Sequence, residues 1–221
     1  MRCLLVYAHP EPTSFTHALM ERARDILRAA GHDCELSDLY ADSFNAVAGR
    51  HDFTSVDNPD RLSLQGEQAR AAAVAAVSDD LRREQQRLSR ADLVIFLFPL
   101  WWGGPPAILK GWFDRVLAFG FAYREGTRFE TGLFRGKRAM VCATTGGTAH
   151  RFTDGGTYGS IRQVLWPLEH CVLDYLGLDR LDPFIAYAAP RVDDAGRQAY
   201  LDAWDRHLRL VLRDGQASGG V

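Results

Sequence analysis

The sequence predicts a doubly wound α/β domain, in which helices cover both faces of a five-stranded parallel sheet. Short continuous apolar segments alternate along the 221 residues with longer segments of helical period. This alternation is typical of a parallel sheet that is buried on both faces. The apolar composition of 47% and the chain length suit one domain with a full hydrophobic core.

Five apolar segments are expected to form strands. The first and the third are the most apolar, so they are expected at the centre of the sheet. The order along the sheet is predicted to be 2-1-3-4-5, numbering the strands along the chain. The predicted strands cover residues 3–8, 34–39, 93–99, 139–144 and 183–188.

Five segments show the spacing of apolar residues that a helix requires. The first ends at Gly31, a usual helix stop, and the third begins after Pro105-Pro106, which suits a helix start. The predicted helices cover residues 15–30, 78–90, 107–118, 158–176 and 196–212.

Two segments do not fit the alternation of strands and helices. Residues 40–77 separate the second strand from the next clear helix, a length that usually serves function or oligomer contacts. We expect an insertion there, within a single domain of residues 1–213. Residues 214–221, rich in Gly and Ser, are expected to form a flexible tail.

The charge balance limits the class of partner. Lys and Arg number 26 and Asp and Glu 28, so nucleic acid is not an expected partner. The longest apolar run, residues 93–102, is too short for a bilayer span, and no secretory signal is visible, so we expect a cytoplasmic protein without membrane insertion. The four cysteines lack metal-binding spacing, and no metal site is expected.

In a doubly wound sheet, ligands bind beyond the carboxyl ends of the strands. The loop at residues 9–16 brings hydroxyl groups and backbone N–H groups to a helix start, as a phosphate site requires. The alternative is that Thr13 or Ser14 is only an N-cap. His9 is a further candidate for contact with the phosphate.

Two further loops follow the third and fourth strands. Trp101 and Trp102 lie in a turn just past a buried strand, where they can form a wall for a flat heteroaromatic ring. Alternatively, the two rings fill core space beneath the loop. Gly146 and Gly147 let the main chain approach a ligand closely, although a plain glycine-rich turn explains them nearly as well.

These loops belong to a longer pattern. Residues 98–116, FPLWWGGPPAILKGWFDRV, and the GFAY that follows at 120–123 resemble the NAD(P)H:quinone oxidoreductases of the DT-diaphorase type, which are flavodoxin-like flavoproteins. The resemblance extends over most of the chain. It includes AHPE at 8–11, ADLVIF at 91–96, TTGG at 144–147 and LWP at 165–167.

The resemblance implies a flavodoxin-like fold and a homodimer that holds each flavin at the subunit interface. FAD is expected rather than FMN, with NADPH or NADH as co-substrate. The residues that match flavin-binding positions fall into three groups. They are His9, Ser14, Phe15 and Thr16 at the phosphate end; Pro99, Leu100, Trp101, Trp102 and Gly103 along the isoalloxazine; and Thr144, Thr145, Gly146 and Gly147 at its far edge.

The chain departs from the family pattern at the reaction centre. The Tyr and His that assist charge transfer in the DT-diaphorase type correspond to Phe152 and Tyr158. Phe152 can supply only a stacking surface, so the Tyr158 hydroxyl is the candidate proton donor. Together with the N–H groups of Gly146 and Gly147, it is expected to stabilise negative charge that develops on the flavin.

The sequence therefore predicts an NAD(P)H dehydrogenase (quinone)-type enzyme. It is expected to reduce quinones or similar flat electrophiles by two-electron hydride transfer through its flavin. One alternative is a flavin-binding regulatory subunit of a membrane transporter, because the same fold and binding site can serve a different function in another protein. The other alternative is an electron carrier of the flavodoxin type.

Overall fold

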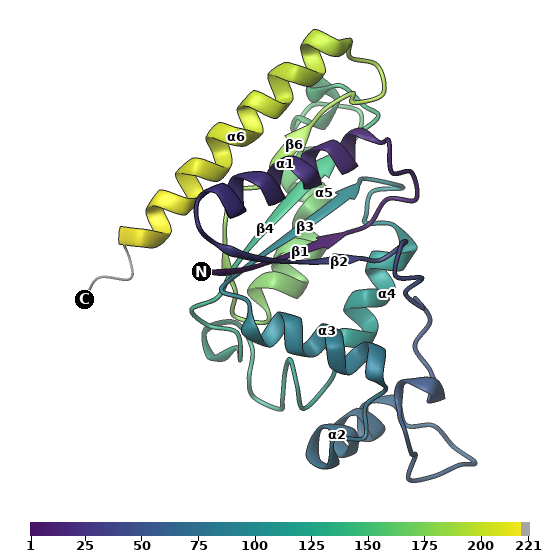
Figure 1. Ribbon diagram of the computed structural model, residues 1–221. Helices are drawn as coiled ribbons and strands as arrows, with labels where there is room; N and C mark the ends of the chain where they lie inside the picture. Colours follow the sequence, from purple (N-terminus) through teal and green to yellow (C-terminus); the bar gives the residue numbers. More distant parts are fainter. Residues whose placement is uncertain (218–221) are drawn as a thin grey trace.

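The computed structural model describes the backbone of residues 1–217 as a parallel sheet between two layers of helices (Figure 1). The strand order is β2-β1-β3-β4-β5, and each pair of neighbouring strands is parallel. The predicted fold class and strand order are thus confirmed. The strands are β1 Arg2–Tyr7, β2 Asp33–Asp38, β3 Leu93–Pro99, β4 Arg138–Thr144, β5 Asp179–Arg180 and β6 Phe184–Ala186.

The last position in the sheet is shared by two short strands instead of the one predicted. Both β5 and β6 pair with β4, the first with Arg138 and Ala139 and the second further along. Pro183 lies between them and has no backbone N–H to donate to the sheet, which explains the interruption. The sequence predicted only the second strand, because β5 is short, charged and exposed.

All five predicted helices are present, and the predicted insertion contains a further helix, Leu64–Val74. Two of the five differ clearly from their predicted bounds. The predicted helix 158–176 begins only at Ile161, because Gly159 has a φ of 75° and Ser160 is the N-cap, and it becomes a π-helix at Glu169–Asp174. The helices are α1 Phe15–Ala29, α2 Leu64–Val74, α3 Asp79–Arg90, α4 Ala107–Val116, α5 Ile161–Leu168 and α6 Asp194–Ala217, with 3-10 turns at Arg50–Asp52, Phe129–Thr131 and Ala149–Phe152.

The last helix is longer than predicted. Residues 214–217, expected to start the tail, continue the backbone of α6 to Ala217. The other tail residues, 218–221, lie outside the described part of the chain. Within residues 1–217, no helix is both long and apolar enough to cross a bilayer.

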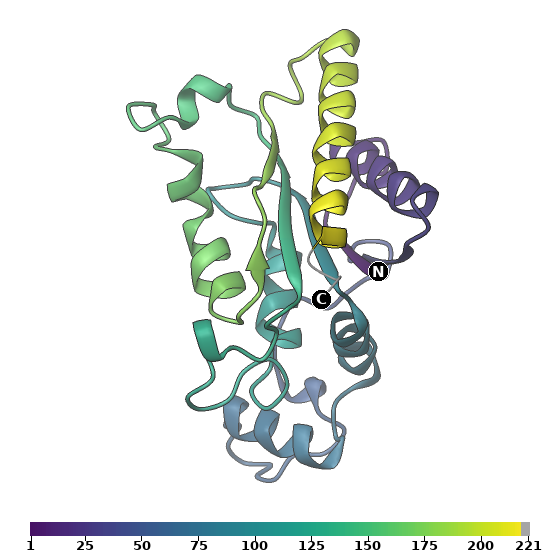
Figure 2. The same cartoon turned by 90° about the vertical axis from the view of Figure 1, so that its left-hand side faces the viewer.

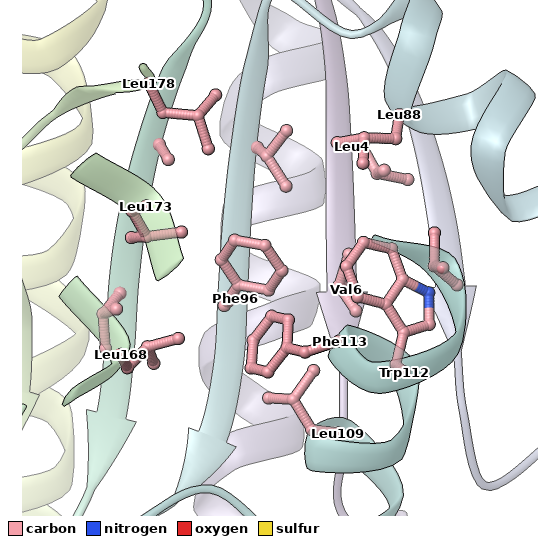
Figure 3. Close-up of a cluster of buried hydrophobic side chains, with 14 of the residues drawn as sticks. Leu4, Val6, Leu88, Phe96, Leu109, Trp112, Phe113, Leu168, Leu173 and Leu178 are labelled. Carbon is pink, nitrogen blue, oxygen red and sulfur yellow. The ribbon is translucent and has the colours of Figure 1, made fainter. Parts of the chain in front are cut away.

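Successive residues of the central strands point to opposite faces of the sheet and pack in two separate hydrophobic cores. Leu4 and Val6 of β1 belong to the core that includes residues of α3, α4 and α5, whereas Leu5 belongs to the core that includes residues of α1 and α6. These two groups of helices lie on opposite faces of the sheet (Figures 1 and 2). Figure 3 shows Trp112 of α4 packed in the first core with Val6, near Phe96 of β3. Burial on both faces is the reason that these strands consist almost entirely of apolar residues.

The predicted insertion, residues 40–77, packs outside the sheet, and its helix α2 lies at the lower end of Figure 1. A buried arginine of α4 holds it in place. Arg115 donates to Asp52 over 2.8 Å and to the carbonyl of Asn45 over 2.6 Å, and it pairs with Asp80 of α3 over 3.0 Å. Breaking such a buried pair typically costs about 3–5 kcal/mol, so the insertion is firmly tied to α4.

Candidate active site

Two adjoining cavities lie beyond the carboxyl ends of β1, β3 and β4. We call them cavity A, of about 630 Å³, and cavity B, of about 450 Å³. Leu100, Trp102, Thr145 and Gly146 line both. Every residue that the sequence analysis proposed for the site lines at least one cavity, although its role in binding stays a prediction.

The first loop leads into the start of helix α1, which opens into cavity A. The Ser14 hydroxyl accepts a hydrogen bond from the His17 N–H over 3.1 Å, so Ser14 is the N-cap of α1. The N–H groups of Phe15 and Thr16 have no acceptor within residues 1–217, as expected at the start of a helix. Both residues line cavity A, and their N–H groups therefore suit an anion as well.

Two short hydrogen bonds tie the first, second and third loops together. The hydroxyls of Thr16 and Thr144 lie 2.9 Å apart, and both side chains are buried. The Leu100 N–H donates to the Thr144 carbonyl over 2.8 Å. The end of β4 is thus fixed to the start of α1 on one side and to the tryptophan loop on the other.

The tryptophan loop is a tight two-residue turn. Trp101 and Gly104 exchange backbone hydrogen bonds of 2.9 and 3.0 Å, and the two residues between them have positive φ angles, 50° at Trp102 and 76° at Gly103. This is the geometry of a type I′ turn, in which a non-glycine residue costs about 1–3 kcal/mol. Trp102 is fully exposed and Trp101 is exposed by 43%, so the alternative that the two rings fill the core is wrong.

The third loop is fixed by its neighbours. Thr145 donates from its hydroxyl to the Gly147 carbonyl over 2.8 Å, and the N–H groups of Ala188 and Ala189 bond to the Gly147 and Thr145 carbonyls. A Cβ atom at Gly147 would lie 2.9 Å from the Phe152 ring, whereas a Cβ atom at Gly146 would meet nothing within 4 Å. Gly147 is therefore required by packing, and Gly146 faces open space in the cleft.

Phe152 and Tyr158 stand against this loop in cavity B. Their ring centroids are 5.1 Å apart, and the Phe152 ring also lies 5.7 Å from that of Tyr187. Phe152 is buried, whereas Tyr158 is half exposed. The buried ring therefore supports the exposed one, and both residues line cavity B.

His9 is uncharged near neutral pH. Its Nδ1 atom accepts a hydrogen bond from the Glu11 N–H over 3.0 Å, so the proton of the neutral ring is on Nε2. Burial is the largest influence on the pKa of His9 and lowers it from the usual value. The ring lies beside Trp101, with a centroid separation of 6.1 Å, and His9 lines cavity A.

Several lining residues were missed by the sequence analysis. Ala189, Pro190 and Arg191 follow β6, so inspection of the loop after the last strand, at the same sheet edge, would have found them. Arg151 and Arg197 carry no local sequence signal, because each reaches the cleft only through the fold. Among residues 1–213, no carboxylate side chain lines either cavity, and the charged groups that do are arginines.

The cysteines are distributed unequally. Cys3 and Cys142 are buried and Cys34 is half-buried, but Cys171 is exposed. Burial raises the pKa of Cys3 to about 12 and that of Cys34 to about 11, which keeps both thiols protonated at neutral pH. A search of the described residues finds no cluster of three or more His, Cys, Asp or Glu side chains able to hold a metal ion.

The arrangement of this site can be compared with known proteins. A family model described as having a flavodoxin-like fold matches residues 1–208. The chain is 38% identical over 214 residues to the rat NAD(P)H dehydrogenase (quinone) 1, with coverage of 96% of this chain and 78% of the relative. It is 39% identical to the human ribosyldihydronicotinamide dehydrogenase (quinone), with coverage of 96% and 93%.

Solved structures agree with the sequence relatives. A protein from Klebsiella pneumoniae that is described as a quinone reductase has a TM-score of 0.91 and 37% identity, covering 96% of this chain and 85% of that one. The NAD(P)H:quinone oxidoreductase from Methanothermobacter marburgensis has a TM-score of 0.72 and 28% identity, covering 93% and 94%.

Proposed function

The chain belongs to the flavodoxin-like family of NAD(P)H:quinone oxidoreductases, and on this basis we propose that it transfers two electrons from NADH or NADPH to a quinone or a similar flat electrophile. One observation supports this most strongly: three loops and a helix start converge on the adjoining cavities A and B. The two alternatives, a transporter subunit and an electron carrier, have no comparable support. The relatives reported above are named as dehydrogenases or reductases of quinones.

The residues of the cleft fit a flavin. Cavity A offers free N–H groups at Phe15 and Thr16 and the neutral His9 ring, which together suit a phosphate group. The open space at Gly146 allows a flat ring to approach the main chain. We propose FAD rather than FMN because the sequence resembles the larger, dimeric quinone oxidoreductases; Arg197 lines cavity A, but its guanidinium is paired with Asp194. Mass spectrometry of the flavin released by heat tests this assignment.

Bound flavin would supply the hydride-transfer chemistry between a nicotinamide and a quinone. The chain orients the reactants and stabilises charge. Trp101 and Trp102 provide a stacking wall. The N–H groups of Gly146 and Gly147, which find no acceptor within residues 1–217, can donate where negative charge develops.

Two aromatic residues complete the proposed reaction centre. Tyr158 lines cavity B and would supply its hydroxyl proton there, and Phe152 supplies a stacking surface that keeps the Tyr158 ring in place. Neither residue needs a charge for this role. Donation from the Tyr158 hydroxyl offsets part of the negative charge that builds up during reduction.

We further propose a homodimer in the cytoplasm. Trp101, Trp102 and Tyr158 are large, exposed side chains around one cleft, and a second copy of the chain would cover them. The molar mass in solution, measured by light scattering, tests the dimer. Fractionation of the source cells tests the location.

Colour and turnover test the function. A purified protein that is yellow, loses its colour with NADH or NADPH in the absence of oxygen, and recovers it with menadione is the expected result. Yellow protein that neither nucleotide bleaches would instead indicate an electron carrier. Colourless protein that binds neither added FAD nor added FMN would contradict the proposed function, and only the assignment of the fold would remain.

A further inference from the structure

Cavity B has an unbalanced positive charge. Its lining is mainly apolar, with Leu100, Phe152 and Val164, but it includes two arginines, Arg151 and Arg191. Among residues 1–213, no carboxylate lines the cavity, and neither arginine forms a salt bridge. A cleft lined by one sign of charge focuses its field on a ligand of the opposite sign.

Both arginines stand on fixed backbone. Arg191 follows β6 in a turn closed by a hydrogen bond of 2.7 Å from its N–H to the Ala188 carbonyl. The guanidinium of Arg191 also donates to the carbonyl of Gly146, a residue that lines both cavities. This bond uses one N–H group and leaves the other donors of the guanidinium free.

Arg151 is held in position by its contacts with the neighbouring aromatic residues Phe152 and Tyr158. Arg151 belongs to the 3-10 turn Ala149–Phe152, and its carbonyl accepts a hydrogen bond of 2.9 Å from the Tyr158 N–H. Its neighbour Phe152 is buried, which fixes the turn against the third loop. The side chain of Arg151 thus starts from a rigid point at the wall of cavity B.

We propose that Arg151 and Arg191 form an anion-binding pair that selects substrates in which a phosphate, sulfonate or carboxylate is joined to a flat ring. This inference rests on the proposed function. The apolar lining would hold the ring, and the guanidinium groups would bind the anion where it leaves the cavity. The anion has two possible sources: the phosphates of the nicotinamide nucleotide, or an acidic group on the acceptor.

Direct binding tests the pair without turnover. The oxidised, flavin-loaded protein is titrated by calorimetry with 1,4-naphthoquinone-2-sulfonate and with neutral menadione. Arg151→Gln and Arg191→Gln should each weaken sulfonate binding about fivefold and leave menadione binding unchanged. Arg191→Lys should keep most of the preference, and about 1 M salt should abolish it. Arg209→Gln, an exposed arginine on α6, is the matched control.

Steady-state kinetics distinguish the two sources of the anion. A higher KM for NADH and NADPH in the variants, with no change for dihydronicotinamide riboside, which lacks phosphate, would assign the pair to the donor. A higher KM for the sulfonated quinone alone would assign it to the acceptor. Equal losses for charged and neutral compounds, or no loss for either, would overturn the inference. Failure of the wild type to reduce menadione with any donor would instead contradict the proposed function, and the calorimetric test would still stand.

Discussion

The hydroxyl groups of Thr16 and Thr144 lie 2.9 Å apart and join the first turn of α1 to the carboxyl end of β4. The two residues are 128 positions apart in the chain, and both are buried. This contact holds the proposed phosphate-binding end of the cleft against the loop that carries Gly146. The cleft therefore forms only when segments that are far apart in the chain, here the start of α1 and the end of β4, are held together.

Thr144→Val should leave the Thr16 hydroxyl buried without its partner. The expected loss in free energy of unfolding is about 1–2 kcal/mol, measured by urea denaturation. The double variant with Thr16→Val removes both hydroxyls and should lose less than the sum of the two single variants. Strictly additive losses would show that the two hydroxyls do not interact.

The two glycines of the third loop should respond differently to alanine. Gly147→Ala places a Cβ atom 2.9 Å from the Phe152 ring, so we expect a loss of about 1–3 kcal/mol in the free energy of unfolding. Gly146→Ala meets nothing within 4 Å and should leave stability unchanged while weakening flavin binding. Thermal unfolding of the flavin-free proteins and a flavin titration measure the two effects. Equal stability of both variants would contradict this view of the loop.

Replacing Trp102 should make the protein more stable but weaken its binding of ligands. Its φ of 50° is unfavourable for a bulky residue, and its exposed ring gains nothing from burial. Trp102→Asn, with a residue that suits a type I′ turn, should raise the free energy of unfolding by about 0.5–1 kcal/mol. The same change should weaken flavin or quinone binding. Unchanged affinity for both ligands would remove Trp102 from the stacking wall.

Tyr158→Phe tests the proposed proton donor. Loss of a preorganised donor is worth up to about 3 kcal/mol, so flavin reduction in a single turnover should slow by up to about a hundredfold. Flavin affinity should not change, because the ring that packs on Phe152 is kept. An unchanged rate of reduction by NADPH would exclude the hydroxyl from the mechanism. Phe152→Leu is the companion variant, and it should loosen the Tyr158 ring.

His9 should make the stability of the flavin-free protein depend on pH. Burial lowers its pKa, so the folded protein binds the His9 proton less readily than the unfolded chain does. The resulting stability is complete above the unfolded pKa of about 6.5 and is lost as the pH falls through the folded pKa. His9→Asn keeps an acceptor for the Glu11 N–H but cannot titrate. Urea denaturation should show a smaller loss for the variant between pH 7 and pH 5, and parallel curves would contradict the assignment.

Most of the sheet could be predicted from local pattern. Strand β3 was predicted over residues 93–99 and is Leu93–Pro99, because a strand buried on both faces must be continuously apolar. The short strand β5, Asp179–Arg180, could not be predicted in the same way. Its side chains are exposed and charged, and only pairing with β4 gives it an extended conformation.

The cleft was predicted less completely than the sheet. Loops that follow the strands of a doubly wound sheet are the expected places for a binding site. The three loops that the sequence analysis selected all line cavities A and B. Arg151 and Arg197 were missed because an arginine in a turn or a helix has no distinctive pattern. Their approach to the cavities depends on where the 3-10 turn and α6 are placed by packing.

By itself, the sequence determined most of the order of elements, the buried strands and the loops that line the cleft, because apolar periodicity and turn residues act over a few neighbouring positions. Only the tertiary structure decided that Trp102 is exposed instead of buried and that Gly147 packs on Phe152 while Gly146 faces the cleft. It also brought Arg191 to the Gly146 carbonyl, 45 positions away. Such contacts depend on the positions of segments far apart in the chain, and no local pattern encodes them.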